Sequence, residues 1–132
     1  DRGTIGDTVV GAGSKIDDLV MVAHGVRLGR DCLLVAQSGI AGSTVVGDRF
    51  TIAGQSGVSG HVRIGDDCIV AAKSAVFDDL PDRSFVGGVP AQDHRAWRRV
   101  QAVQKRLPDL RNEIRRLGER VAALEARLDE EE

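Results

Sequence analysis

Aliphatic residues recur at every sixth position over more than half of the chain. A period of six matches neither the 3.6-residue turn of an α-helix nor the two-residue alternation of a long strand. It is typical of very short strands joined by tight turns, with three strands in each eighteen-residue coil. We therefore predict a parallel β-helix of hexapeptide repeats over residues 1–80, with about four coils. The repeating positions are Val10, Ile16, Val22, Leu28, Leu34, Ile40, Val46, Ile52, Val58, Ile64, Val70 and Val76.

A similarity between segments eighteen residues apart supports this arrangement. The stretch AQSGIAGSTVVGD (36–48) aligns with GQSGVSGHVRIGD (54–66), and Gly-Asp or Gly-Arg-Asp turns return in the same phase. Two residues before each aliphatic position the side chain is usually small or β-branched, and Phe50 is the exception. Ser38 and Ser56 occupy such positions, so we interpret both as inward-facing structural residues rather than nucleophiles.

The six-residue pattern ends after Val76. Residues 81–93 include Gly87, Gly88 and Pro90 in an irregular context, and we expect a connecting loop there. Helical periodicity then predicts a C-terminal helical extension over residues 94–132, with one helix over 94–107 and a second that begins near Pro108.

The second predicted helix carries a heptad pattern. Such a seam packs against another helix. Its partner is either a second copy of the chain, for which β-branched residues at a and Leu at d favour two parallel strands, or the 94–107 helix of the same chain. The aliphatic residues of the seam are Leu110, Ile114, Leu117, Val121, Leu124 and Leu128.

Composition and charge narrow the function classes. Aromatic residues make up only 3% of the chain, so its core has to be built from aliphatic side chains. The net charge of −2 gives no overall attraction to nucleic acid or anionic lipid. The start of the extension is nevertheless basic, which indicates either a solvated helix face or a docking surface for an acidic protein. Its first cations are Arg95, Arg98, Arg99, Lys105 and Arg106.

Cys32 and Cys68 lie two coils apart, which is about 10 Å at the usual spacing of β-strands. That separation is too long for a disulfide, so we expect small buried thiols in a reducing compartment and a cytoplasmic protein. The sequence shows neither a signal peptide nor an apolar run long enough to span a membrane. Because Asp1 falls in the middle of the repeat pattern, we expect the chain to be a fragment of a longer protein.

Three functions are compatible with such a β-helix: acyl transfer, metal-dependent hydration and a purely structural solenoid. A zinc site needs three ligands at suitable spacing, but only His24 and His61 lie on the predicted β-helix, and His94 lies beyond it. We therefore expect no metal and no cofactor. Two interpretations of His24 stay open, a general base and an ordinary turn residue bonded to backbone.

Several motifs of the chain resemble those of one family. They are KIDDLVMVAHGVRLG (15–29), AQSGIAGSTVVGD (36–48), SGHVRIGDD (59–67), GGVPA (87–91) and the following WRR (97–99). In this order and spacing they are similar to the UDP-3-O-acylglucosamine N-acyltransferases of lipid A biosynthesis. The resemblance implies a left-handed β-helix, a homotrimer with active sites between subunits, and an N-terminal uridine-recognition domain before Asp1.

The implied reaction moves a 3-hydroxyacyl group from acyl carrier protein to the 2-amino group of UDP-3-O-acylglucosamine. The resemblance assigns His24 as the general base and Asp17 as the residue that orients it. It assigns Gly42 as a backbone donor to the thioester oxyanion and His61 as a substrate-binding residue. The basic residues of the extension then dock acyl carrier protein. No nucleic acid and no metal is implied.

Two features next to these residues need explanation. Gly42 comes eighteen residues after His24 and is expected one coil away, about 4.8 Å along the axis, but it is equally explained as a turn glycine with positive φ. Gly25 stands immediately after His24, where the family usually has Asn. We also expect Ala75 to face inward and to leave room for a long hydroxyacyl chain.

Two alternative functions stay open. One is a structural trimerising fragment that is inactive without its N-terminal domain. The other is a different hexapeptide acyl- or acetyltransferase that uses coenzyme A.

Overall fold

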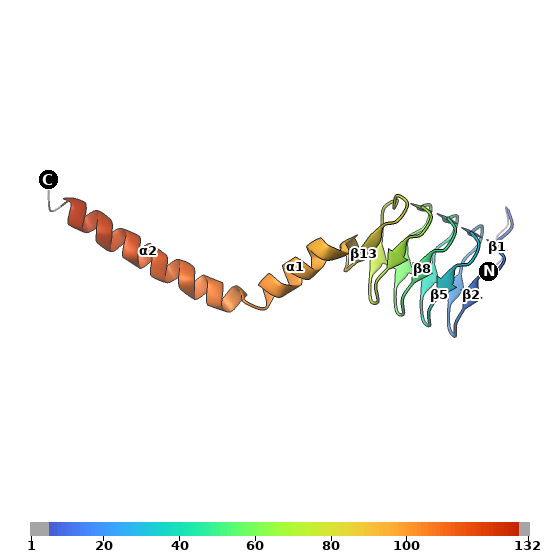
Figure 1. Ribbon diagram of the computed structural model, residues 1–132, viewed down its shortest axis with the longest axis horizontal. Helices are drawn as coiled ribbons and strands as arrows, with labels where there is room; N and C mark the ends of the chain where they lie inside the picture. The colour runs from blue at the N-terminus through green and yellow to red at the C-terminus, as the bar shows by residue number, and fades with distance from the viewer. Residues whose placement is uncertain (1–5, 130–132) are drawn as a thin grey trace. The chain divides into compact units, whose positions relative to one another are not determined.

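The computed structural model of the protein describes residues 6–129 (Figure 1). Each of the first twelve strands ends on one of the aliphatic positions that recur every six residues. The strands are β1 Val9–Val10, β2 Lys15–Ile16, β3 Met21–Val22, β4 Arg27–Leu28, β5 Leu33–Leu34, β6 Gly39–Ile40, β7 Val45–Val46, β8 Thr51–Ile52, β9 Gly57–Val58, β10 Arg63–Ile64, β11 Ile69–Val70, β12 Ala75–Val76, β13 Phe85–Gly87 and β14 Gln92–Asp93. The helices are α1 His94–Gln104 and α2 Leu107–Asp129.

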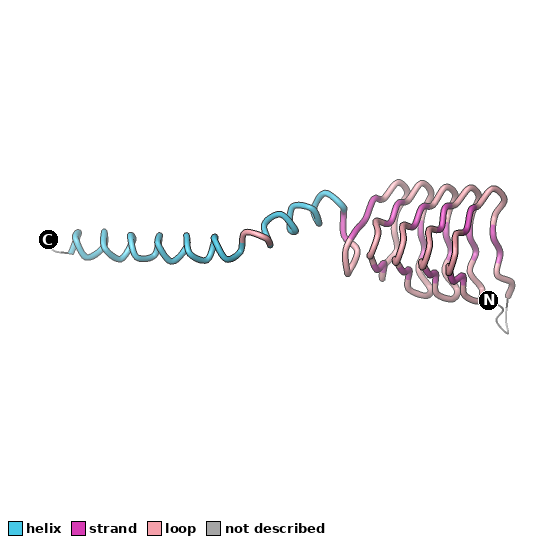
Figure 2. The backbone as a smooth tube through the Cα atoms, turned by 90° about the horizontal axis from the view of Figure 1, so that it is seen from below, coloured by secondary structure: helices cyan, strands magenta, loops and turns pink. Residues whose placement is uncertain are grey.

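The strands of successive coils stack into three sheets (Figure 2). The sheet orders are β1-β4-β7-β10, β14-β13-β11-β8-β5-β2 and β12-β9-β6-β3. Pairing is parallel except between β13 and β14, and its register advances by eighteen residues, with Val10 opposite Leu28 and Leu28 opposite Val46. The prediction of a left-handed parallel β-helix with three strands in each coil is confirmed.

The core of the β-helix is formed by the aliphatic residues that end the strands. Leu34, Ile52 and Val70 are fully buried one above another. Leu33, which precedes Leu34, is 41% exposed, because neighbouring residues of a strand point to opposite sides. Phe50 also points inward and is fully buried, so its ring supplies bulk that the aliphatic residues alone do not.

The small residues two positions before each strand end face inward as well. Ser38 and Ser56 are 2% and 4% exposed, and the Ser56 hydroxyl donates a hydrogen bond to the Ala71 carbonyl at 2.8 Å. Cys32 and Cys68 are buried and free, as predicted. Burial raises the pKa of the Cys32 thiol, so this side chain stays protonated.

Each corner of the β-helix turns through a residue with positive φ, three positions after a strand end. Examples are Gly25 (65°), Gln37 (61°) and His61 (62°). A residue other than glycine in this region costs on the order of 1–3 kcal/mol. Hydrogen bonds between coils offset that cost, as where the His61 N–H donates to the Gly42 carbonyl at 3.1 Å.

The recurring Gly-Asp turns stack on one corner and are joined by aspartate side chains. Asp48 Oδ1 accepts a hydrogen bond from the Arg30 N–H, and Asp66 Oδ1 accepts one from the Asp48 N–H, both at 2.8 Å. Beside them Arg49 donates to both carboxylate oxygens of Asp67, at 2.6 and 2.9 Å. These hydrogen bonds lower the pKa of Asp67. Their stabilising effect is present above the ordinary carboxyl pKa and is lost as pH falls through the lowered value.

Residues 81–93, expected to form a connecting loop, include strands β13 and β14. The last coil is shorter than the others, since Val86 pairs with Val70 only sixteen residues earlier. Phe85 stacks on His94 with ring centroids 4.0 Å apart. Trp97 lies so close to Gly88 that a β-carbon there would be 2.7 Å from its ring. This segment closes the C-terminal end of the core, in which Val86 takes part.

The two helices are separated by a proline. α1 is capped by Asp93, whose Oδ1 accepts a hydrogen bond from the Ala96 N–H at 2.9 Å. Pro108 lacks the N–H that would bond the Gln104 carbonyl, and its ring crowds that turn. The predicted 94–107 helix therefore ends earlier, at Gln104, and α2 begins at Leu107.

Within residues 98–127, the helical seam does not pack against another helix. α1 and α2 follow one another without packing side by side, so the structure does not show the alternative in which the seam packs against the 94–107 helix. Residues 98–132 separate from residues 1–97 as a second compact unit. Within residues 6–129, no helix is long and apolar enough to cross a membrane.

The packing of the core predicts that Phe50→Ala destabilises the β-helix. Because Phe50 is the largest fully buried side chain, we expect a loss of about 3–5 kcal/mol in unfolding free energy from the cavity left behind. Thermal and urea unfolding followed by circular dichroism measure it. Phe77→Ala is the matched control, since Phe77 is 55% exposed. An equal loss in both variants would contradict this packing.

Candidate active site

Three of the residues singled out in the sequence lie on one corner of the β-helix. This histidine corner comprises the turns 23–26, 41–44 and 59–62, which follow β3, β6 and β9 of one sheet. It carries His24, Gly42 and His61. Backbone hydrogen bonds hold the turns in step, because the Ser43 N–H donates to the His24 carbonyl at 2.9 Å and the His61 N–H donates to the Gly42 carbonyl.

The His24 imidazole lies against the backbone of Gly42. A β-carbon at position 42 would be 2.5 Å from Nε2 and 2.6 Å from Cε1 of His24, which is closer than carbon atoms in real contacts. Gly42 is not among the residues with positive φ. Its interpretation as a turn glycine that needs positive φ is therefore wrong. Glycine is needed there for the space that the His24 ring occupies.

An exposed imidazole and a backbone N–H without an acceptor in the described residues lie side by side at this corner. The His24 side chain is exposed. The Gly42 N–H donates to no acceptor within the described part of the chain. An accessible imidazole can accept a proton near neutral pH, and a free amide N–H can donate to a developing oxyanion. The pair therefore has the chemistry that acyl transfer requires.

Gly25 keeps the turn beside His24 intact. Its φ of 65° lies in the left-handed region, which glycine and Asn both adopt readily. The Gly25 N–H donates to Thr8 Oγ1 at 3.1 Å. A β-carbon at position 25 would be 3.7 Å from Ser43 Oγ, an ordinary contact distance. The backbone at Gly25 is therefore one that Asn could also adopt, and a β-carbon fits there without displacing Ser43.

Asp17 lies at a different corner, in the turn between β2 and β3. Its Oδ1 accepts a hydrogen bond from the Asp18 N–H at 2.9 Å, and its Oδ2 accepts one from the Ala36 N–H at 3.3 Å. The carboxylate therefore binds backbone amides of its own corner. Within one chain, the structure does not bring Asp17 to His24.

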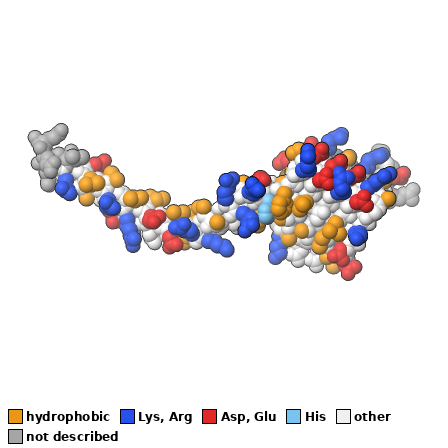
Figure 3. All heavy atoms as spheres, viewed as in Figure 1, with side chains coloured by type: hydrophobic (Ala, Val, Ile, Leu, Met, Phe, Trp, Pro, Cys, Tyr) orange, Lys and Arg blue, Asp and Glu red, His pale blue; other side chains and the backbone are white. Residues whose placement is uncertain are grey.

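The predicted docking cations line the first helix and the turn after it. Figure 3 shows Lys and Arg side chains spread over this helical part. All five are exposed, and none forms an ion pair with an acidic side chain in the described residues. Their charge is therefore available to a partner. They are Arg95, Arg98, Arg99, Lys105 and Arg106.

Sequence reasoning missed a row of small residues beside the histidine corner. Gly39, Gly57 and Ala75 begin β6, β9 and β12 and face outward. The expectation that Ala75 faces inward is wrong, because the buried Val76 follows it. A β-carbon at Gly57 would meet nothing within 4 Å, so the chain itself does not require glycine there. Glycine inside a strand often marks the close approach of a ligand or another backbone. The sequence does contain a signal for this row, because the residue directly before the strand-ending aliphatic residue is small at all three positions.

Known proteins share the hexapeptide repeat and much of the sequence of this chain. Residues 7–42 match a family model described as Bacterial transferase hexapeptide (six repeats). UDP-3-O-acylglucosamine N-acyltransferase 1 of Gloeobacter violaceus is 55% identical over 128 residues, which are 97% of this chain and 37% of that protein. The UDP-3-O-acylglucosamine N-acyltransferase of Anaeromyxobacter sp. is 59% identical over 115 residues, 87% of this chain and 33% of that protein. The chain belongs to the UDP-3-O-acylglucosamine N-acyltransferase family.

Within this family the chain matches the C-terminal part of longer proteins, and it spans little more than a third of their length. A solved structure of perosamine N-acetyltransferase from Caulobacter crescentus, in complex with CoA and GDP-perosamine, has 35% sequence identity. It covers 65% of this chain and 44% of that chain, with a TM-score of 0.52. The β-helix is thus similar to that of an N-acetyltransferase whose structure holds CoA and GDP-perosamine.

The site predicts a local effect for Gly42→Ala. The added methyl overlaps the His24 ring, so we expect the ring to move while the fold stays intact, because φ at position 42 suits alanine. The NMR signals of the His24 ring protons report the movement, and the melting temperature reports the fold. Gly57→Ala is the matched control for the His24 signals and should leave them unmoved, because a β-carbon there meets nothing within 4 Å. A His24 signal that does not move in Gly42→Ala contradicts the packing described.

Proposed function

We propose that the protein transfers a 3-hydroxyacyl group from acyl carrier protein to the 2-amino group of UDP-3-O-acylglucosamine in lipid A biosynthesis. The observation that carries the proposal is the accessible His24 ring seated on Gly42, whose N–H is free. Identities of 51–59% to family members of that name support the substrate class.

His24 acts as the general base in the proposed reaction. The amine nitrogen attacks the thioester carbonyl, and His24 takes a proton from it as the C–N bond forms. The Gly42 N–H donates to the carbonyl oxygen, which carries negative charge in the tetrahedral intermediate. The C–S bond then breaks, and the sulfur leaves with a proton returned by His24. Because glycine leaves room for the His24 ring against its backbone, the base and the oxyanion donor lie next to each other.

We assign His61 to substrate binding. Its side chain is exposed on the histidine corner, one coil beyond Gly42. A substrate that extends along the corner from His24 reaches it after about 10 Å, the spacing of two coils. The outward-facing row that includes Gly39 and Gly57 supports a place for a long acyl chain on the surface beside the histidine corner. This replaces the place inside the β-helix that was expected from Ala75.

A homotrimer with sites between neighbouring chains fits the position of Asp17. Because Asp17 and His24 of one chain lie on different corners, we assign the orienting role to Asp17 of a neighbouring copy. The row of small residues beside the histidine corner supports a close approach at this face.

The exposed cations of the first helix are proposed to dock acyl carrier protein, because a strongly acidic partner is attracted to unpaired Arg and Lys side chains. Docking of this kind weakens as salt screens the charges. The binding surface comprises Arg95, Arg98, Arg99, Lys105 and Arg106.

His24→Ala tests the reaction in the full-length protein. We expect the rate of acyl transfer from acyl carrier protein to UDP-3-O-acylglucosamine to fall by about 10²–10⁴-fold, as when a general base is lost. Melting temperature should not change, since the side chain is exposed. Full activity of the variant contradicts the proposed base. Equal turnover with a coenzyme A thioester would favour the alternative of a coenzyme A-dependent transferase.

Arg98→Glu combined with Arg99→Glu tests the docking surface. At low salt we expect the KM for the acyl carrier protein donor to rise about tenfold or more, because attraction becomes repulsion, while kcat changes little. The difference should shrink at high salt. Arg115→Glu with Arg116→Glu carries the same charge change on α2 and should leave KM nearly unchanged. An unchanged KM in the first variant at low salt contradicts this surface.

A further inference from the structure

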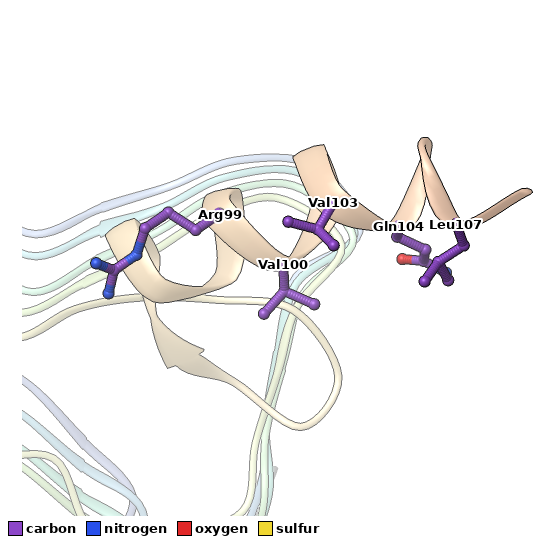
Figure 4. Close-up of a pocket in the computed structure, with 5 residues that line it drawn as sticks. All are labelled: Arg99, Val100, Val103, Gln104 and Leu107. Atoms are coloured by element: carbon purple, nitrogen blue, oxygen red, sulfur yellow. The ribbon is translucent and has the colours of Figure 1, made fainter. Parts of the chain in front are cut away.

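The hollow at the turn between α1 and α2 contributes no reactive group. Its volume is about 580 Å³, and Figure 4 shows the side chains that line it. None of them is a histidine, a carboxylate, a hydroxyl, a thiol or a lysine amine, which are the groups that serve acid–base and nucleophilic chemistry. The histidine corner, in contrast, contains a hydroxyl that the proposed reaction does not yet use. The residues that line the hollow are Arg99, Val100, Val103, Gln104 and Leu107.

That hydroxyl belongs to Thr8, which binds the backbone on both sides of His24. It donates a hydrogen bond to the Ala23 carbonyl at 3.2 Å and accepts one from the Gly25 N–H at 3.1 Å. Thr8 lies in the coil before His24, directly before strand β1. Because branching at the β-carbon restricts the threonine side chain, the hydroxyl has little freedom to move. The two hydrogen bonds therefore fix the backbone just before and just after the imidazole-bearing residue.

The hydroxyl at the next corner of the β-helix shows what is particular to Thr8. Ser14 donates to the Gly29 carbonyl and accepts from the Cys32 N–H, both at 3.1 Å. Both hydroxyls donate to the carbonyl fifteen residues later, which ties one coil to the next. Ser14 accepts from the N–H eighteen residues later, whereas Thr8 accepts from the N–H seventeen residues later. This difference places the second hydrogen bond of Thr8 directly after His24.

The coil after His24 holds it from the other side. The Ser43 N–H donates to the His24 carbonyl at 2.9 Å, and the Gly42 backbone supports the ring. The residue that follows His24 is Gly25, and glycine has a wider choice of backbone conformations than any other residue. The hydrogen bond from the Gly25 N–H to Thr8 restricts that choice. The backbone around His24 is therefore held between the coil before it and the coil after it.

We propose that Thr8 is a positioning residue for His24, because its hydroxyl holds the turn that keeps the imidazole on the Gly42 backbone, next to the oxyanion donor. The inference rests on the proposed function, since positioning a base has an effect only if His24 is the base. A displacement of a catalytic group by about 1 Å can lower a rate about 10²-fold. Substrate binding elsewhere on the corner does not depend on the Thr8 hydroxyl, so the effect belongs in kcat and not in KM.

Thr8→Val in the full-length protein tests the inference, because it removes both hydrogen bonds and keeps the shape of the side chain. We expect kcat for acyl transfer to fall about tenfold, the KM values of both substrates to change little, and the NMR signals of the His24 ring protons to move. Thr8→Ser keeps the hydroxyl and should restore most of the rate. Ser14→Ala is the matched control, since it removes the corresponding two hydrogen bonds at a corner without a histidine. It should leave kcat and the His24 signals unchanged.

The His24→Ala variant separates this inference from the proposed function. In that background Thr8→Val should lower the remaining rate no further, because the hydroxyl acts through the imidazole. If His24→Ala loses activity while Thr8→Val keeps kcat and the His24 signals, the positioning role is wrong and the proposed base stands. An equal fall of kcat in Thr8→Val and Ser14→Ala is a general effect of lost hydrogen bonds between coils and also contradicts the role. A fully active His24→Ala variant overturns the proposed function itself, and with it any part of Thr8 in the reaction.

Discussion

The hydrogen-bonded register between residues eighteen apart is the constraint on which the rest of the structure depends. It stacks Val10, Leu28 and Val46 and keeps aliphatic side chains inside every coil. A turn longer by one residue would move each later strand residue to the opposite face. The same register sets the His24 ring on Gly42. The candidate site is therefore a product of the repeat rather than an addition to it.

Much of this arrangement could be predicted from the sequence. The interior contains almost no aromatic residues, so the aliphatic residues that fill it recur strictly at every sixth position. Counting eighteen residues from His24 also identifies Gly42 as its neighbour. The period does not reveal how the ring lies, so it could not show that Gly42 provides space rather than positive φ. Ala75 was misplaced because strand alternation was not applied to the residue before each strand end.

The predictions failed where the repeat changes length, and the role of Asp17, which came from resemblance alone, stays a prediction. Strand β13 escaped notice because the last coil has sixteen residues, which breaks the period. Asp17 was linked to His24 by resemblance, although seven residues carry the chain past a corner. The end of the first helix was predicted at residue 107 and not at Gln104, because the hydrophobic pattern does not show the hydrogen bond that Pro108 removes from that turn.

Chemical rescue of His24→Ala in the full-length protein tests the central claim most directly. With the imidazole side chain removed and Gly42 unchanged, the space above the Gly42 backbone is open to a small base. Single-turnover acyl transfer should recover as imidazole is added, and the added rate should rise with the fraction of neutral imidazole. Added imidazole should not increase the rate of the Gly42→Ala variant, which keeps the His24 side chain. Transfer by His24→Ala at the rate of the unchanged protein, or a complete lack of rescue, contradicts His24 as the base.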